Sequence, residues 1–254
     1  MSDRQNDTLE RLAEEFGVEI RLLEETASTN DLAADPELHE GDVVMALHQS
    51  EGRGQRGNVW SAERGANLTF SMVLEPEFLP AERQFLLSQA VSLAIVDWLG
   101  RRGVDARIKW PNDIYVKDRK IAGILIEHTL SGAELQRSVV GIGLNINQVE
   151  FDPQLPNPIS LAMITGSKSD IFEALGELYR CLLVRYSFLV ERDWERIESD
   201  CLAALYLLDE PHTFSLDGQP VEGTIRGIGP HGELEVEHPA PLGRRSYLFK
   251  EIVF

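Results

Sequence analysis

Two spacings of hydrophobic residues divide this chain into expected helices and strands. Apolar residues three and four positions apart predict helices, whereas alternating or short continuous apolar runs predict strands. Helical spacing occurs in the stretches 8–16, 83–102, 170–191 and 193–208. Strand-like spacing occurs in the stretches 20–23, 42–48, 67–74, 107–110, 114–116, 121–127 and 135–147. This part of the chain is therefore expected to contain both helices and strands.

Polar residues mark the starts of two of the helices. Asp170 stands three residues before Glu173, the spacing of a capping box with Asp in place of Ser or Thr. Ser28, Thr29 and Asn30 precede a short Leu-Ala-Ala stretch. Ser, Thr and Asn are preferred N-caps, so a helix start alone would explain them.

The sequence changes character after residue 208. Short strand-like stretches, 213–216, 221–228, 233–237 and 246–253, are separated by turn sequences rich in Gly and Pro. Such closely spaced short strands suggest a small SH3-like barrel. We therefore predict two domains, residues 1–208 and 209–254.

Composition and charge exclude several classes of protein. Of 254 residues, 43% are hydrophobic and 26% are charged, as in soluble globular proteins. No apolar run approaches the roughly 20 residues that span a bilayer, and the polar, acidic N-terminus is not a signal peptide. Both cysteines lie in helix-like sequence, which suggests reduced core thiols and a cytoplasmic setting.

The net charge of −18 argues against a nucleic-acid partner, because the phosphate backbone would be repelled. One locally basic zone remains, at residues 107–120. Positive charge kept at one place in an acidic protein suggests a small anionic ligand there, although a solvated strand face would also explain it.

The most unusual stretch is a loop rich in Gly and Arg, Gln49–Trp60, which holds three glycines and two arginines. Each interior glycine would cost a helix roughly 1 kcal/mol relative to alanine, so we expect a loop whose backbone approaches a ligand closely. Backbone N–H groups and guanidinium groups both bind phosphate or carboxylate. The alternative is a mobile surface loop with solvated arginines.

Four motifs together resemble those of the biotin–protein ligases. They are Ser28-Thr-Asn30, the loop Gln49–Trp60, Lys109-Trp-Pro-Asn-Asp113 with the following Arg119–Gly123, and Gly141-Ile-Gly-Leu-Asn145. They occur in that family's order and spacing, over roughly residues 20–147, and the C-terminal part fits more loosely. The resemblance implies an α+β fold of the class II aminoacyl-tRNA-synthetase type. A mixed β-sheet flanked by helices would precede a small C-terminal SH3-like β-barrel.

The resemblance also implies a two-step, ATP-dependent ligation. The carboxylate of biotin attacks the α-phosphate of ATP, which gives biotinyl-5′-AMP and pyrophosphate. A lysine of the biotin carboxyl carrier protein of a biotin-dependent carboxylase then attacks the acyl carbon and expels AMP. Some relatives carry a DNA-binding domain ahead of the catalytic part. This chain starts almost directly at the catalytic part, so we expect the form without that domain.

The resemblance assigns roles by motif position. Lys120 and Arg53 would be the catalytic cations, and Trp60 would stack on adenine. Asp113 would hold Mg²⁺, which prefers carboxylate and phosphate oxygens. Residues 28–30 suit the ureido group of biotin, with its two donors and one acceptor, and this role is compatible with capping a helix. The expected biotin site consists of Ser28, Thr29, Asn30, Gln49, Arg53, Gly54, Gln55, Lys120 and Gly123. The expected ATP site consists of Arg53, Arg56, Trp60, Asn112, Asp113, Lys120 and Asn145.

One departure and two alternatives remain. The family's loop often reads Gly-Arg-Gly-Arg-x-Gly, and here the second arginine is Gln55, next to Arg56. A lipoate–protein ligase shares the fold and the adenylation chemistry, and a non-catalytic regulator that binds biotin or nucleotide is a rival of another class. The expected partners are biotin, ATP and the carrier protein, with no DNA and no membrane. A homodimer is left open.

Overall fold

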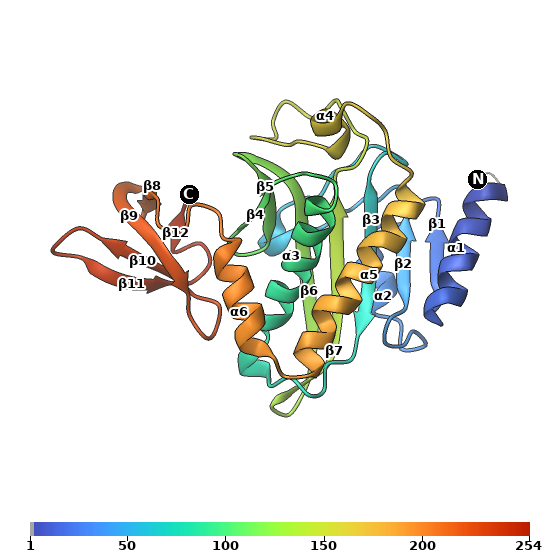
Figure 1. The fold of residues 1–254 in the computed structure, drawn as a ribbon, viewed down its shortest axis with the longest axis horizontal. Coiled ribbons are helices and arrows are strands. Elements are labelled where there is room, and N and C mark those ends of the chain that lie inside the picture. Colours follow the sequence, from blue (N-terminus) through green and yellow to red (C-terminus); the bar gives the residue numbers. More distant parts are fainter. Residues whose placement is uncertain (1–2) are drawn as a thin grey trace.

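Two β-sheets organise the protein (Figure 1). The structure is a computed structural model that describes residues 3–254, except for the side chains of residues 3–6 and 56. The larger sheet has seven strands in the order β1-β2-β3-β7-β6-β5-β4. These strands are β1 Ile20–Leu23, β2 Val43–Ala46, β3 Leu68–Leu74, β4 Ala106–Lys109, β5 Asp113–Val116, β6 Arg119–Ser131 and β7 Glu134–Leu144. β1 and β2 are parallel and the other neighbours are antiparallel, so the mixed sheet predicted from the sequence is confirmed.

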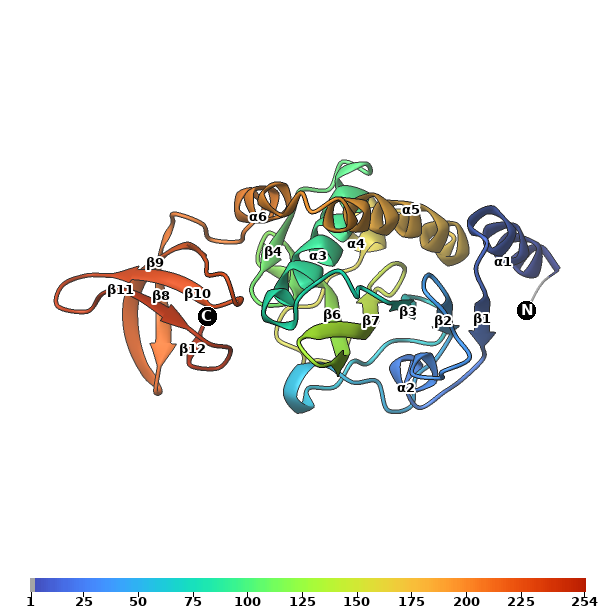
Figure 2. The same ribbon diagram turned by 90° about the horizontal axis from the view of Figure 1, so that it is seen from below.

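Helices cover the two faces of this sheet unequally. Figure 2 shows α3, α5 and α6 on one face and α2 on the other. The helices are α1 Asp3–Phe16, α2 Thr29–Ala33, α3 Phe85–Gly100, α4 Leu161–Thr165, α5 Ile171–Val190 and α6 Trp194–Ala203, with short 3-10 turns η1 Gln55–Gly57 and η2 Ala81–Arg83. The main hydrophobic core lies between the sheet and the layer formed by α3 and α5. All seven residues of β3 are buried, as expected for a strand in the middle of the sheet.

The predicted helix starts are partly confirmed. The Asp170 side chain accepts hydrogen bonds from the backbone N–H groups of Phe172 and Glu173 and caps α5. Ser28 is the N-cap of α2, yet its side chain makes no capping hydrogen bond. The Ser28 hydroxyl therefore does not stabilise the helix end in the way its position suggests.

The smaller sheet is formed by the C-terminal part and is fully antiparallel, in the order β11-β10-β9-β8-β12. Its strands are β8 Pro211–Leu216, β9 Gln219–Ile228, β10 Leu234–His238, β11 Gly243–Tyr247 and β12 Ile252–Val253. The prediction of one strand over 246–253 is wrong, because β11 and β12 lie at opposite edges of the sheet. A turn separates them, in which Glu251 N–H donates to Leu248 O and Lys250 has a φ of 76°.

The last helix is shorter than its apolar spacing predicts. α6 ends at Ala203, and the chain then runs beside β4. Ile108 N–H donates to Ala204 O at 2.8 Å, and Tyr206 N–H donates to Ile108 O at 2.9 Å. Leu205 is thereby brought into the core of the smaller sheet, so its apolar side chain serves that core and does not continue a helix stripe.

Trp110 directly follows β4 of the larger sheet, yet its side chain belongs to the core of the smaller sheet. Trp110 is 5% exposed and packs in the cluster that contains Phe214, Ile225 and Val236. Its indole N–H donates to Gly232 O at 2.8 Å. The two sheets are thus joined through the side chain that follows Lys109, and the domain division at 208/209 stays a prediction.

Both cysteines are buried free thiols. Burial raises the pKa of Cys201 to about 12, so this side chain is a protonated, unreactive thiol at neutral pH. Among residues 3–254, the longest and most apolar helices still fall short of what crossing a membrane requires.

We predict that Trp110→Ala lowers the free energy of unfolding by about 3–5 kcal/mol, because it empties the shared core and leaves the Gly232 carbonyl unpaired. Urea unfolding followed by circular dichroism measures this loss. Trp194→Ala is the matched control, since Trp194 is only half-buried on α6, and it should cost clearly less. Equal losses for the two variants would contradict a special role of Trp110 in joining the sheets.

Candidate active site

A cavity of about 720 Å³ lies beside α2 and is lined by segments from both sheets. Its walls come from α2, the Gly/Arg loop, β3, β5, β6, β7 and the C-terminal residues. The predicted site residues that line it are Ser28, Thr29, Asn30, Gln49, Arg53, Gly54, Gln55, Trp60, Asn112, Asp113, Lys120 and Gly123. Every residue of the expected biotin site is therefore brought to one cavity, together with most of the expected ATP site.

Glycines form the floor of this cavity. Gly123 on β6 is paired in register with Gly143 on β7. A methyl group on Gly143 would overlap the Trp60 ring, and one on Gly141 would overlap the amide oxygen of Asn30. Because no side chain stands there, a group from α2 and one from the Gly/Arg loop reach the backbone of β7.

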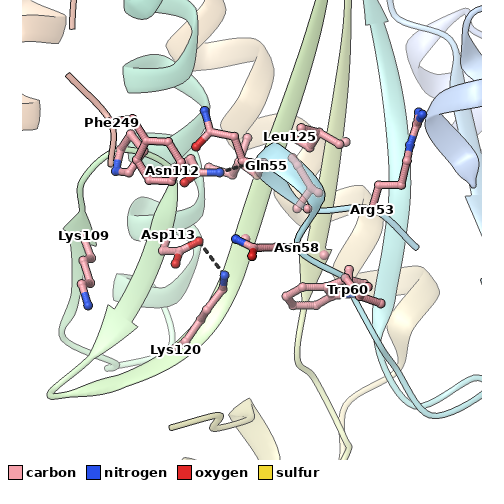
Figure 3. A pocket seen from close by; sticks show the side chains of 18 of the residues that line it. Arg53, Gln55, Asn58, Trp60, Lys109, Asn112, Asp113, Lys120, Leu125 and Phe249 are labelled. Carbon is pink, nitrogen blue, oxygen red and sulfur yellow. Dashed lines mark hydrogen bonds and ion pairs between the residues drawn. The ribbon is translucent and has the colours of Figure 1, made fainter. Parts of the chain in front are cut away.

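A partly buried ion pair lies across β5 and β6. Lys120 Nζ is 2.6 Å from Asp113 Oδ1, with side chains 33% and 24% exposed (Figure 3). The backbone of Lys120 is held on its other side, since its N–H donates to Asn157 O and its carbonyl accepts from Ile159 N–H. The backbone from which the ammonium group extends is thus held in place at one end of the cavity.

Arg53 is directed away from Lys120 (Figure 3). Its Nη2 lies 2.6 Å from Asp31 Oδ1 and 3.1 Å from Glu127 Oε2. The two predicted catalytic cations are therefore apart, and each is paired with carboxylates of the protein. Arg53 has to exchange these partners before it can contact an anion in the cavity. Its side chain is 44% exposed, where such ion pairs contribute little stability, so the exchange costs little.

The polar end of the cavity is formed by residues that follow β1 and β2. Thr29 donates to Gln49 Oε1 twice, from its backbone N–H at 2.7 Å and from its hydroxyl at 3.0 Å. Ser28, Thr29 and Asn30 are each about 95% buried. These side chains and Gln49 thus lie together at one end of the cavity, and their contact with biotin stays a prediction.

Of two asparagines in the expected ATP site, one lines the cavity and the other does not. Asn112 lines the cavity, but its Nδ2 donates to Ile124 O at 2.6 Å and joins β5 to β6. Asn145 is buried outside the lining residues, and its amide donates to Ile159 O at 3.0 Å. Arg56 also belongs to the expected ATP site, but its side chain lies outside the described part of the structure. Nucleotide contacts by these residues stay predictions.

The C-terminal residues are the part of the lining that sequence reasoning missed. Phe249, Ile252, Val253 and Phe254 border the cavity. Lys109 belongs to one of the motifs and also lines the cavity, and its Nζ lies 4.6 Å from the Tyr115 ring centroid and 4.8 Å from that of Phe254. The motif was sufficient to indicate Lys109 as a site residue. No local sequence pattern predicts that the C-terminal residues contact a segment so distant in the chain.

Comparison with known proteins agrees with these observations. The profile of the Biotin/lipoate A/B protein ligase family matches residues 21–145. The bifunctional ligase/repressor BirA of Escherichia coli is 39% identical over 232 residues, 87% of this chain and 70% of that protein. The biotin–[acetyl-CoA-carboxylase] ligase of Paracoccus denitrificans is 33% identical over 244 residues, 92% of this chain and 99% of that protein. The chain belongs to the biotin/lipoate ligase family.

Solved structures support the fold of this ligase. The biotin protein ligase from Aquifex aeolicus in complex with biotin and ATP aligns with a TM-score of 0.78 at 24% identity, covering 92% of this chain and 97% of that chain. The predicted fold, a mixed sheet with helices and a small C-terminal antiparallel sheet, is confirmed by this likeness and by the topology.

Proposed function

We propose that this ligase activates biotin with ATP to biotinyl-5′-AMP and then transfers biotin to a lysine of a biotin carboxyl carrier protein. The observation that carries the proposal is one cavity with a polar end, a glycine floor and the Lys120–Asp113 pair. The name of the Paracoccus relative and the ligands of the Aquifex structure, biotin and ATP, support it. A cytoplasmic setting is part of the same proposal.

Biotin would lie with its ureido head at the polar end and its acyl chain over the glycine floor. The head has two N–H donors and one carbonyl acceptor, which match the hydroxyl and amide groups of Ser28, Thr29, Asn30 and Gln49. The Trp60 ring, packed on Gly143, would border the chain and stack on the adenine of ATP. This orientation directs the carboxylate of biotin toward Lys120.

The first step brings two anions together, the carboxylate of biotin and the α-phosphate of ATP. A carboxylate oxygen forms a bond to phosphorus while the bond to pyrophosphate breaks. Negative charge at the reacting oxygens favours a fixed cation, and Lys120 is held both by its backbone and through its ammonium group. Lys120 would exchange Asp113 for the oxygens of the substrates.

Asp113 would then be free to hold Mg²⁺. Within the described part of the chain, no three His, Cys, Asp or Glu side chains cluster as a metal site. The carboxylate of Asp113 suits Mg²⁺, which is commonly held by one or two carboxylates together with phosphates of the substrate. When bound, Mg²⁺ would neutralise phosphate charge. In the second step the carrier's lysine amine attacks the acyl carbon, and AMP leaves.

The experiment that tests the proposal is ATP–pyrophosphate exchange with Mg²⁺ and either biotin or lipoate. We expect exchange with biotin and none with lipoate, because the polar end suits a ureido head. Mass spectrometry of a biotin carboxyl carrier domain incubated with the ligase, ATP and biotin should show one added biotinyl group. Exchange with lipoate alone would replace the proposal by a lipoate–protein ligase, and exchange with neither would leave a non-catalytic binder.

We predict that Lys120→Ala lowers the exchange rate at least about a hundredfold, as loss of one preorganised charge donor typically does. Lys168→Ala is the matched control, since Lys168 is exposed in a loop away from the cavity lining. It should exchange at the wild-type rate. Full activity of Lys120→Ala would mean that the ammonium group only pairs with Asp113.

A further prediction separates the neighbouring loop residues Arg53 and Gln55. Gln55 is neutral, and one neutral hydrogen bond contributes about 0.5–1.5 kcal/mol, so Gln55→Ala should slow exchange by about tenfold or less. Arg53→Ala should slow it clearly more, because charge-assisted hydrogen bonds to carboxylate or phosphate are stronger. Both variants are measured side by side in the exchange assay. Equal losses would refute this division of roles.

A further inference from the structure

We infer that two side chains outside the cavity, Ser71 on β3 and Glu127 on β6, set which groups at its polar end donate hydrogen bonds and which accept them. They thereby select a ligand head with two N–H donors. Neither residue is among those that line the cavity. The inference deepens the proposed function and rests on it, and it makes Ser71 and Glu127 positioning residues.

Glu127 fixes the amide of Asn30. An ionised carboxylate can only accept, so the amide nitrogen of Asn30 faces Glu127 Oε2, at 2.7 Å. The same nitrogen lies 3.4 Å from Leu125 O, which takes the second N–H. The amide oxygen of Asn30 faces Ser71 Oγ at 2.6 Å. Both N–H groups of Asn30 are therefore occupied, and only a lone pair of its oxygen is left for a ligand.

Ser71 fixes the hydroxyl of Thr29 in the same sense. Thr29 gives its proton to Gln49 Oε1, and its oxygen lies 2.7 Å from Ser71 Oγ. Ser71 is therefore the donor in this contact, and its single hydrogen is shared between the oxygens of Thr29 and Asn30. Both oxygens therefore accept from Ser71, and both residues line the cavity.

The donors at the polar end are separate groups. Neither the hydroxyl of Ser28 nor the amide nitrogen of Gln49 has a hydrogen-bond partner among the described residues, and both side chains line the cavity. Two acceptors beside two donors are the complement of a cyclic urea, whose two N–H groups flank a carbonyl. A dithiolane head would leave these buried groups unpaired, which a site built for hydrogen bonds rejects strongly.

The arrangement is held rigidly. Ser71 is 0% exposed in a strand that is buried over its whole length, so its hydroxyl cannot exchange its protein partners for solvent water. The backbone of Gly141 lies directly beneath the amide oxygen of Asn30, where even a methyl group would overlap it. Asn30 is thus confined on three sides, by Gly141, Ser71 and Glu127.

The test is the affinity for biotin of the Ser71→Ala protein, measured by isothermal titration calorimetry. Loss of the one donor to two acceptors should weaken biotin binding about tenfold. In the exchange assay the KM for biotin should rise by the same factor, with kcat and the KM for ATP unchanged, because the head lies away from the reacting carboxylate. Ser138→Ala is the matched control: Ser138 is 0% exposed on β7 and hydrogen-bonded to His128, and this variant should bind biotin like wild type.

A second pair of variants isolates Glu127. Glu127→Gln and Glu127→Leu both remove the charge that pairs with Arg53. Only Glu127→Gln keeps an oxygen that accepts from Asn30, so it should bind biotin more tightly than Glu127→Leu. The difference between the two reports the acceptor oxygen at position 127, which Asn30 and Arg53 both contact.

The outcomes distinguish this inference from the function on which it rests. Absence of biotin binding by the wild-type protein would overturn the proposed function. Biotin binding by wild type together with Ser71→Ala affinity within about twofold of it, well below the loss of one hydrogen bond, would overturn only the inference. A Ser71→Ala protein with lowered kcat and unchanged KM for biotin, or with the same loss as Ser138→Ala, would overturn it as well.

Discussion

The close approach of side chains to the bare backbone of β7 is the constraint on which the candidate site depends. Asn30 comes from α2 and Trp60 from the Gly/Arg loop, and both contact this strand at glycines. Such an approach needs a strand that is firmly supported from behind. β7 has that support, because it lies between β3 and β6 in the sheet and the layer of α3 and α5 covers the opposite face. The helix layer therefore stabilises the glycine floor, and the floor allows α2 and the Gly/Arg loop to converge.

Charge compensation is the second property of the site. The chain carries a net charge of −18, yet the cavity contains cations that suit anionic substrates. In the structure Lys120 is paired with Asp113, and Arg53 with Asp31 and Glu127. Asp113 keeps Lys120 from standing unpaired at a partly buried position, where isolated charge is unfavourable, whereas Arg53 is exposed and depends less on its partners. Substrate oxygens would thus replace existing carboxylate partners. The net free-energy gain from each new contact is therefore smaller than it would be if the cation were unpaired beforehand.

The sequence predicted the larger sheet and most of the cavity because both depend on local patterns. Apolar spacing located its strands, and motif order indicated that Ser28–Asn30, Gln49–Trp60 and Lys109–Asp113 meet. Contacts between distant segments were not predictable in this way. The left-handed backbone at Lys250 interrupts the strand predicted over 246–253. A lysine in the sequence gives no indication of this conformation. Ser71 and Glu127 likewise resemble ordinary strand residues until the fold places them beside Asn30.

The smaller sheet is part of the site's geometry because its core includes Trp110. The indole ring is buried in that core, and the preceding residue, Lys109, is held between the rings of Tyr115 and Phe254. The residues that follow lead directly into β5, where Asp113 pairs with Lys120. Removing the smaller sheet would expose a tryptophan to water, which is unfavourable for so large an apolar surface, and would release Lys109. The position of the motif that carries Asp113 is therefore determined from two directions, by the ladder of the larger sheet and by the core of the smaller one.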